Sequence, residues 1–374
     1  MQAIHRFCDN ILSPNDYFEF YILRKEKLIM SFPTPPLDLV LGNLQSAYQA
    51  RGWPCQVMAN PIIRQLPWST LFFVTLGTGR IVVKIVHFPD QTTAEISWQA
   101  EELLQRGQRE YETMVKLEQH FEGMTDFHTI HPILYLKEIN AIVMEHIDAV
   151  PVHHFYPQPD RLWRMDSNAL QTFYQAGAWL AHFHRLPLQL FDPHRQHHPQ
   201  ESLATLLTHQ QHLEGHGVHL TAIPYWEKAL ERLSQITETP YCWVHGDFHM
   251  RNILRQSDGR LIGFDTALEL IESPAYDLGK FLADLQTRKE RLVTGLPGLA
   301  QIAHLRQAFL EGYGPLSVSS DLLALYEGRF MLQKWKESLE ALPDALKFAL
   351  GKQINRVMRQ NFREWAAKIT QNIS

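Results

Sequence analysis

Residues 243–252 read Trp-Val-His-Gly-Asp-Phe-His-Met-Arg-Asn and place polar side chains between two short apolar runs. The runs at 241–244 and 253–254 predict buried strands, and Ser-Asp-Gly at 257–259 predicts a hairpin turn that leads into a third strand at 261–264. The polar residues therefore fall on loops at strand ends, where rigid flanking strands can position them.

Three side chains with oxygen atoms carry the chemistry of this segment. Asn252 follows Asp247 by five residues, and Asp265 follows it by eighteen, at the end of the third strand. Phosphoryl transfer needs a carboxylate to orient a hydroxyl nucleophile and oxygen ligands to hold Mg²⁺ beside the phosphates. The spacing from Asp247 to Asn252 is that of a kinase catalytic loop. We therefore predict Asp247 as the catalytic base and Asn252 and Asp265 as magnesium ligands.

The same stretch resembles the aminoglycoside phosphotransferase and choline kinase-like family of small-molecule kinases, whose catalytic loop carries His-Gly-Asp. Other segments resemble this family in the same order, at 180–186 (Leu-Ala-His-Phe-His-Arg-Leu), 273–279 (Ser-Pro-Ala-Tyr-Asp-Leu-Gly) and 309–313 (Phe-Leu-Glu-Gly-Tyr). The resemblance implies that His245 is a catalytic residue together with Asp247. It also implies that Asp277 supports the catalytic loop.

The resemblance further implies a fold and its cofactors. The expected fold is α+β and two-lobed, like that of protein kinases. It has an N-terminal antiparallel β-sheet lobe with one main helix and a larger, mostly helical C-terminal lobe. The expected phosphate donor is ATP, with GTP left open, and it is used together with Mg²⁺. The expected acceptor is a hydroxyl group of a small molecule such as a sugar, an amino alcohol or an antibiotic-like compound.

The chain divides into three regions of different character. Residues 1–35 form an N-terminal extension without family resemblance, and Met30 is an alternative start that would exclude residues 1–29 from the native protein. Residues 36–147 are expected to form the nucleotide-binding, β-rich lobe. Residues 148–374 are expected to form the catalytic and substrate-binding helical lobe.

A lysine that could bind the nucleotide lies in the β-rich region. Two runs rich in β-branched residues, joined by a Gly-Thr-Gly turn, predict a hairpin at 71–86 with Lys84 in its second strand. An unpaired buried ammonium group is costly, so Lys84 either faces solvent at a sheet edge or finds a partner. In the predicted helix at 100–121, Glu110 shares a face with apolar residues, whereas Glu112 shares one with polar residues. We therefore predict a Lys84–Glu110 pair and a solvated Glu112.

Two further nucleotide contacts follow from the resemblance. The last strand of the β-rich region ends where the family has its adenine-binding hinge, so backbone groups of Glu145, His146 and Ile147 are expected to bind the adenine edge. The turn that should cover the phosphates reads Leu-Pro-Trp-Ser-Thr and has no glycine, so close approach of its backbone is not assured. The hydroxyl groups of Ser69 and Thr70 are expected to bind phosphate instead.

Composition disfavours several other classes of protein. The formal charge of −5 and the pI near 6.5 give no reason to expect a nucleic-acid partner. Three widely spaced cysteines predict neither a disulfide framework nor a metal site, and they indicate a reducing cytoplasm. No apolar run has the length of a membrane span, and charged residues interrupt the N-terminal segment where a signal peptide would be apolar. The expected partner is the small-molecule substrate, and the oligomeric state is left open.

Histidines cluster at residues 194–219. His209 and His212 could share one helix face and bind zinc. A second pair of ligands is not evident from the sequence, so a polar insertion in the helical lobe is the simpler interpretation.

The acceptor is constrained only by charge. Between residues 315 and 374 the chain has six acidic and nine basic residues, which disfavours a polycationic acceptor. We expect a neutral or acidic hydroxylated metabolite, or an amino alcohol stacked on Trp335 or Tyr326.

Two other classes fit part of the pattern. A metal-dependent hydrolase would use His245, Asp247 and His249 as ligands, but it leaves Lys84 and Glu110 unexplained. A catalytically inactive, kinase-like nucleotide-binding protein would share the fold, although the full set of acidic and amide residues argues against it. Phosphorylation assays over a panel of hydroxyl compounds distinguish these alternatives.

Overall fold

The computed structural model describes residues 35–66, 69–87, 100–156, 166–191, 195–237, 239–266, 270–288, 299–342 and 344–371. The extension before residue 35, His194, and Pro67 and Trp68 of the turn expected to cover the phosphates lie outside this part. The chain forms two compact units. Unit 1 comprises residues 1–112 and 131–146, and unit 2 comprises residues 113–130 and 147–374.

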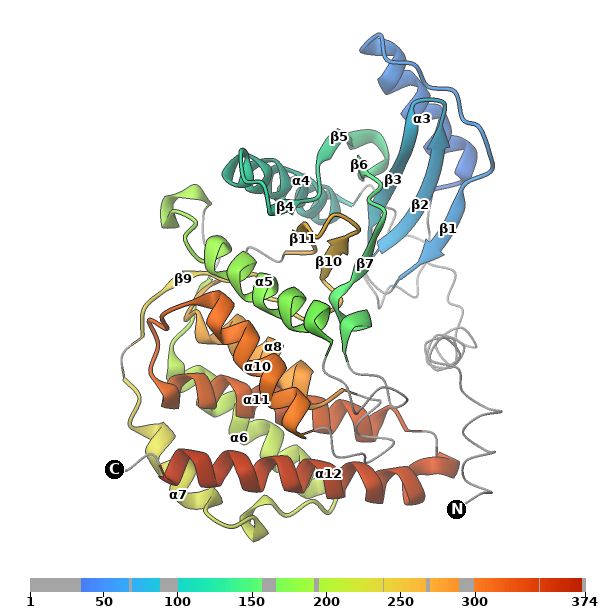
Figure 1. Cartoon of the computed structure of the whole chain (residues 1–374). Coiled ribbons are helices and arrows are strands. Elements are labelled where there is room, and N and C mark those ends of the chain that lie inside the picture. Colours follow the sequence, from blue (N-terminus) through green and yellow to red (C-terminus); the bar gives the residue numbers. More distant parts are fainter. Residues whose placement is uncertain are drawn as a thin grey trace. The chain divides into compact units, whose positions relative to one another are not determined.

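Unit 1 is built on a five-stranded antiparallel sheet in the order β1-β2-β3-β6-β5. Helix α3 lies beside the sheet (Figure 1) and contacts β5. Its buried Val40, Leu44 and Tyr48 share a core with alternate residues of the strands. The β-branched runs form the strands that their pattern predicts. The elements are α3 (Leu37–Ala50), β1 (Ile62–Gln65), β2 (Ser69–Leu76), β3 (Gly79–Val86), β5 (Pro132–Leu136), η1 (Lys137–Ile139) and β6 (Ala141–Glu145).

Helix α4 (Glu101–Phe121) is hydrogen-bonded near its start to residues of β5 and of the β5–β6 connection. The buried Asn140 donates from Nδ2 to the carbonyl oxygen of Leu103 at 2.8 Å. The Tyr135 hydroxyl lies 2.7 Å from Asn140 Oδ1 and 3.2 Å from the carbonyl oxygen of Leu104. A Cβ at Gly107 would lie 2.0 Å from Asn140 Oδ1, so glycine is needed for this approach. These contacts set the position of the helix that carries Glu110.

Unit 2 contains two small sheets and most of the helices. One sheet has the order β4-β11-β10-β7, and the other has the order β8-β12-β9. The strands are β4 (Phe127–Thr129), β7 (Ala149–Pro151), β8 (Arg195–Gln196), β9 (Cys242–Trp243), β10 (Ile253–Gln256), β11 (Leu261–Gly263) and β12 (Leu270–Glu272).

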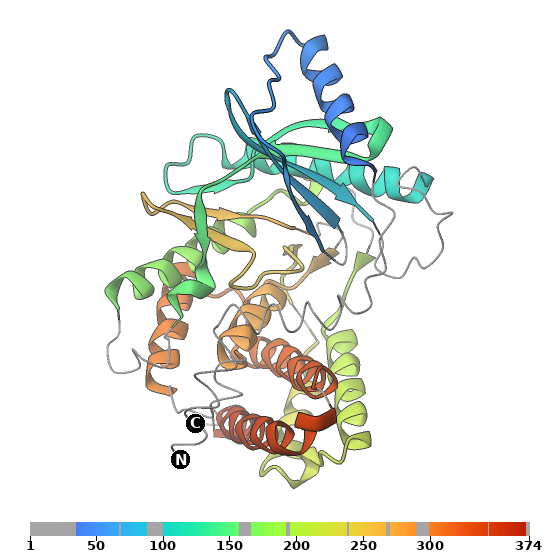
Figure 2. The same cartoon turned by 90° about the vertical axis from the view of Figure 1, so that its right-hand side faces the viewer.

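Helix α11 is central to the packing of unit 2, where it contacts α6, α8 and α12 (Figure 2). Its Tyr326, Met331 and Trp335 are fully buried, as expected of apolar residues at helical spacing. The helices are α5 (Ser167–Phe183), α6 (Pro199–Gly215), α7 (Trp226–Ser234), α8 (Ala275–Gln286), α10 (Leu299–Tyr313), α11 (Ser320–Glu340) and α12 (Asp344–Gln371), with short η2 (Val152–Phe155), η4 (Leu188–Leu190) and η5 (Leu220–Ala222).

The predicted fold class is confirmed, because the N-terminal region forms an antiparallel sheet and the C-terminal part is mostly helical. Cys55 and Cys242 are free thiols. Among the described helices, none is both long enough and apolar enough to cross a membrane.

Candidate active site

The first turn of α8 holds the backbone that leads into Asp247. The fully buried Asp277 accepts hydrogen bonds from the backbone N–H groups of His245 at 2.6 Å and of Gly246 at 3.0 Å. His184 Nε2 lies 3.1 Å from the same carboxylate. Gly246 has φ of 79°, in the left-handed region that glycine adopts at little cost. Asp277 therefore makes the loop contacts that its predicted supporting position requires.

The carboxylate of Asp247 is partly exposed and has three polar neighbours. Lys280 Nζ lies 2.7 Å from Oδ1. Asn252 Nδ2 donates to Oδ2 at 3.0 Å and to the backbone oxygen of Asp247 at 2.9 Å. His249 Nε2 lies 3.4 Å from Oδ2. The structure thus brings Asp247 and Asn252 together and adds two basic side chains that the sequence analysis had not placed at a kinase site.

These neighbours keep Asp247 ionised. Partial burial acts to raise the pKa of the Asp247 carboxyl, but the hydrogen bond from His249 and the ammonium group of Lys280 outweigh it. The net result is a pKa well below the usual range of an aspartate. Such a carboxylate is a weak base, so it is better suited to orienting a hydroxyl group than to removing its proton early.

Asn252 and Asp265 lie at the two ends of the β10–β11 hairpin. Asn252 precedes β10 and is 6% exposed, whereas Asp265 follows β11 and is exposed. The N–H of Phe264 donates to the backbone oxygen of Asn252 at 3.1 Å, which ties the strand end that carries Asp265 to the loop. Asp265 has φ of 62°, a left-handed conformation that aspartate and asparagine tolerate better than most residues. The hairpin thus places the backbone of Asp265 next to the loop that carries Asn252.

His245 has its ring in an aromatic cluster of unit 2. The ring is fully buried, with its centroid 5.5 Å from that of Phe248 and 5.7 Å from that of Phe183. Burial lowers the pKa of His245, so the imidazole is neutral. Neither ring nitrogen has a hydrogen-bond partner among the described residues. This position does not fit the metal ligand that the hydrolase alternative required.

Lys280 is the main site residue that the sequence analysis missed. Its Nζ donates to the backbone oxygen of Gly246 at 2.8 Å in addition to its contact with Asp247, and its side chain is 16% exposed. It lies three residues after Asp277 on α8, so both residues face the loop from one side of the helix. A polar residue three positions from a predicted loop-supporting aspartate was the signal available in the sequence.

Unit 1 contains the predicted lysine–glutamate pair. Lys84 on β3 lies between Leu71 of β2 and Ile142 of β6, and its Nζ is 2.6 Å from Glu110 Oε1. The two side chains are 15% and 21% exposed, which leaves the pair accessible to a ligand. Glu112 is exposed and accepts a hydrogen bond from Gln108, as expected of a solvated residue.

Ser69 and Thr70 begin β2 and are both buried. The Thr70 hydroxyl lies 3.4 Å from His87 Nε2. The N–H of Leu66 donates to the backbone oxygen of Ser69 at 2.8 Å. The hydroxyl of Thr70 therefore already has a polar neighbour within unit 1.

The predicted hinge has backbone groups that are already in use. The N–H of Glu145 donates to the oxygen of His131 at 3.1 Å, and the N–H of His146 donates to the oxygen of Arg80 at 3.2 Å. Two of the three N–H groups in the segment from Glu145 to Ile147 thus bond within unit 1. The backbone groups that stay candidates for binding the adenine edge are the carbonyl oxygens of this segment and the N–H of Ile147.

The expected stacking of an acceptor on Trp335 or Tyr326 is wrong, because both side chains are fully buried. Trp335 Nε1 donates to Asn355, and the Tyr326 hydroxyl donates to the buried Glu272 at 2.6 Å. Burial raises the pKa of Glu272, and His197 Nδ1 lies 3.4 Å from its other oxygen. Both aromatic residues belong to the core of unit 2.

Comparisons with known proteins agree with this fold. A model of the phosphotransferase enzyme family matches residues 63–327. A solved protein of Ralstonia eutropha JMP134, assigned as an aminoglycoside phosphotransferase, is 15% identical, and the match covers 87% of this chain and 98% of that chain with a TM-score of 0.56. A spectinomycin phosphotransferase solved with AMP is 13% identical over 86% of this chain and 97% of that chain, with a TM-score of 0.51. The same enzyme solved with ADP and spectinomycin is 14% identical over 83% and 93%, with a TM-score of 0.50. No match was found among curated proteins.

Proposed function

Because the chain belongs to the phosphotransferase enzyme family, we propose that it transfers the γ-phosphate of ATP to a hydroxyl group of a small molecule. The observation that carries the proposal is the hydrogen bond between Asn252 and Asp247, on a loop that the β10–β11 hairpin ties to the strand end of Asp265. Phosphoryl transfer needs this set of oxygen-bearing side chains. The AMP and ADP in the solved spectinomycin phosphotransferase support an adenine nucleotide as donor, with GTP left open.

Asp247 would hold the acceptor hydroxyl in line with the phosphate and take its proton as the bond forms. In a loose transition state the bond to the entering oxygen is barely formed, so little positive charge builds up on the hydroxyl group and positioning contributes more than early proton removal. This fits the lowered pKa of the Asp247 carboxyl. The closing proton transfer would come late in the step.

Asn252 and Asp265 would hold Mg²⁺. Both offer oxygen donors, and magnesium is usually bound by one or two carboxylates with water and substrate phosphates as its other ligands. The Asn252 amide nitrogen is directed at Asp247, which leaves its carbonyl oxygen to face a metal. Magnesium would neutralise charge on the phosphate oxygens.

The nucleotide-binding part would be residues 36–147. Lys84 would contact phosphate oxygens, and Glu110 would hold the Lys84 ammonium in place. The carbonyl oxygens of Glu145 and His146 and the N–H of Ile147 would bind the adenine edge. Ser69, at the start of β2, is a better candidate than Thr70 for phosphate contact, because the Thr70 hydroxyl already faces His87.

His245 and Asp277 would support the loop. The Asp277 carboxylate orients two consecutive N–H groups, while the neutral ring of His245 fills the aromatic cluster beneath the loop. His245 would therefore act as a positioning residue through its backbone and packing.

The acceptor would bind to unit 2, within residues 148–374, and would be neutral or negatively charged. Two cationic side chains lie against one aromatic ring near the loop: Lys280 Nζ is 5.6 Å and Arg329 Cζ is 5.0 Å from the centroid of Phe330. Positive groups at this position repel a polycation. The C-terminal segment, residues 315–374, likewise has more basic than acidic residues.

A panel of hydroxyl compounds tests the function directly. Neutral sugars, sugar acids, hydroxy acids, amino alcohols and aminoglycosides are incubated with ATP or GTP and Mg²⁺, and phosphorus NMR follows the products. We expect a phosphate monoester resonance with a neutral or acidic acceptor, together with nucleoside diphosphate. Nucleotide-dependent thermal stabilisation without any ester over the whole panel would instead indicate an inactive nucleotide-binding protein.

Replacing Lys280 with Met tests how Asp247 is held. Loss of the ammonium raises the pKa of Asp247, and the ionised carboxylate exists only above that pKa. The acidic limb of kcat/KM should therefore move to higher pH, and turnover at pH 7 should fall by about tenfold to a hundredfold because the carboxylate is less well positioned. Lys280→Arg, which keeps the charge, should restore the acidic limb. An unchanged pH profile in Lys280→Met, matching the exposed control Lys228→Met on α7, would remove Lys280 from the site.

A further inference from the structure

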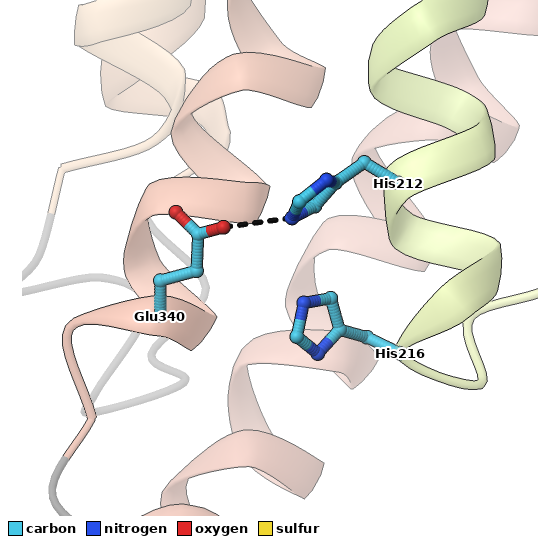
Figure 3. A group of neighbouring side chains, drawn as sticks. All are labelled: His212, His216 and Glu340. Carbon is cyan, nitrogen blue, oxygen red and sulfur yellow. Dashed lines mark hydrogen bonds and ion pairs between the residues drawn. The ribbon is translucent and has the colours of Figure 1, made fainter.

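Three exposed side chains converge where α6 and α11 end. They are His212 in the last turn of α6, His216 just after that helix, and Glu340 at the last residue of α11 (Figure 3). One ligand atom from each lies within 4.8 Å of the other two. His212 Nε2 is 2.7 Å from Glu340 Oε1, and the two imidazole centroids are 5.2 Å apart.

The end of α6 fixes the two histidines relative to each other. They are separated by one helical turn, so their side chains lie on the same face. Between them lies Leu213, whose side chain is fully buried. Its backbone oxygen accepts hydrogen bonds from the N–H groups of His216 at 2.9 Å and of Val218 at 3.0 Å. Gly217 adopts φ of 75°, which closes the helix end as glycine commonly does. The two imidazoles thus extend from an ordered backbone.

Glu340 comes from a second, firmly packed element. Helix α11 contacts α6, and its Trp335, little more than one turn before Glu340, is fully buried. The N–H of Ala341 donates to the backbone oxygen of Glu337 at 3.0 Å and continues the helical pattern past Glu340. The carboxylate and the two imidazoles therefore approach each other from separate helices whose ends are both defined.

The sequence left open a zinc pair of His209 with His212, beside the simpler interpretation of these residues as a polar insertion. His209 is not part of the converging group, and it lies near Lys336 and Arg329. Burial and these two cations lower the pKa of His209. The histidine that joins His212 and Glu340 in the converging group is His216, one turn after His212.

We propose that His212, His216 and Glu340 form a zinc site that joins the ends of α6 and α11. Two imidazole nitrogens and one carboxylate oxygen are a ligand set that Zn²⁺ accepts, with water in the fourth position. Imidazole ligands favour zinc and its neighbours in the first transition row, whereas Mg²⁺ and Ca²⁺ prefer all-oxygen sites. This site is separate in its ligands and its metal from the proposed magnesium site.

The spacing of the three side chains suits this ion after small movements. With zinc–ligand distances of about 2.0–2.1 Å, neighbouring ligand atoms of a tetrahedron are about 3.3 Å apart. The 2.7 Å contact between His212 and Glu340 would have to widen slightly, and His216 would have to move inward. All three side chains are exposed, so rotation about their own bonds can supply these shifts.

The consequence of binding is a cross-link between two helices. An ion that binds the folded chain and not the unfolded one stabilises it in proportion to the logarithm of its concentration over Kd. The effect depends on metal and not on nucleotide. It can therefore be measured without the phosphotransferase reaction.

The test uses the full-length chain without an affinity tag, freed of metal and kept in excess Mg²⁺ so that oxygen-rich sites are filled. Calorimetric titration with ZnCl₂ should give one tight equivalent, and the melting temperature should rise with zinc. His216→Ala and Glu340→Gln should each weaken zinc binding by at least about tenfold and remove most of the shift in melting temperature. His216→Ala is the sharper variant, because it leaves the hydrogen bond between His212 and Glu340 in place.

His219→Ala is the matched control, since His219 is exposed, three residues from His216 and outside the group. It should bind zinc as the parent does. Equal losses of zinc affinity in His219→Ala and His216→Ala would indicate general zinc binding by surface histidines and would overturn the proposal. Parental zinc affinity in His216→Ala, or a parent protein that takes up no zinc, would overturn it as well. Circular dichroism of each variant without metal verifies that the fold is retained.

Discussion

Replacing Asp247 with Asn should lower turnover by about a hundredfold to ten-thousandfold while nucleotide binding stays close to that of the parent. The change removes the proton acceptor and the negative charge that orients the hydroxyl group, and general-base effects are of this size. The fold should persist, because an asparagine can still accept the hydrogen bond from Asn252 and fills nearly the same volume. The loss should appear in kcat more than in KM, since the interaction is made with the reacting hydroxyl.

Steady-state kinetics on the acceptor identified by the panel give the kcat and KM values, and calorimetry with nucleotide alone gives the affinity. Asp258→Asn is a matched control, because Asp258 lies at the β10–β11 turn and bonds to Arg260 rather than to the loop. That variant should keep parental turnover. If Asp247→Asn also kept most of its activity, Asp247 would not be the residue that orients the acceptor.

Replacing Asp265 with Ala should abolish the tightening of nucleotide binding by Mg²⁺. A carboxylate ligand supplies both charge and an oxygen donor to the metal, and neither the alanine side chain nor water restores the charge. Asp265 also has a left-handed backbone, in which alanine is strained. Asp265→Asn separates the two effects, because asparagine tolerates this conformation and removes only the charge. In both variants we expect Mg²⁺ to tighten nucleotide binding far less than it does in the parent.

Calorimetric titrations with ATP, with and without Mg²⁺, measure this directly. Lys84→Ala serves as the comparison. The Lys84 ammonium would contact phosphate oxygens itself, so its loss should weaken the binding of ATP both with and without Mg²⁺. Asp247→Asn should leave the magnesium effect in place. Parental affinity of Asp265→Asn for magnesium-ATP would refute the assignment of Asp265 as a metal ligand.

The sequence was most informative where the signal was local. The period of the apolar residues in α4 separated Glu110 from Glu112, and in the structure Glu110 contacts Lys84 while Glu112 is exposed. Alternation of β-branched residues located the hairpin with Lys84 in the same way. Both inferences needed only the geometry of one helix or one hairpin.

Contacts between distant elements were not accessible to the same reasoning. Lys280 reaches Asp247 only because α8 lies against the loop. The only sign of this packing in the sequence is the three-residue spacing between Asp277 and Lys280. His212 and Glu340 are 128 residues apart, so their contact could not be inferred from the helical spacing of the histidines alone. Trp335 was assigned a ligand-stacking role on residue type alone, whereas burial in the core decided its environment.

The attachment of α4 to Asn140 has a consequence for control of the enzyme. Swinging this helix aside, so as to separate Glu110 from Lys84, would break the Asn140–Leu103 hydrogen bond and the contacts of the Tyr135 hydroxyl. Leaving the buried amide of Asn140 unpaired alone costs about 1–3 kcal/mol. We therefore expect the Lys84–Glu110 ion pair to form as this unit folds, without a separate activating signal.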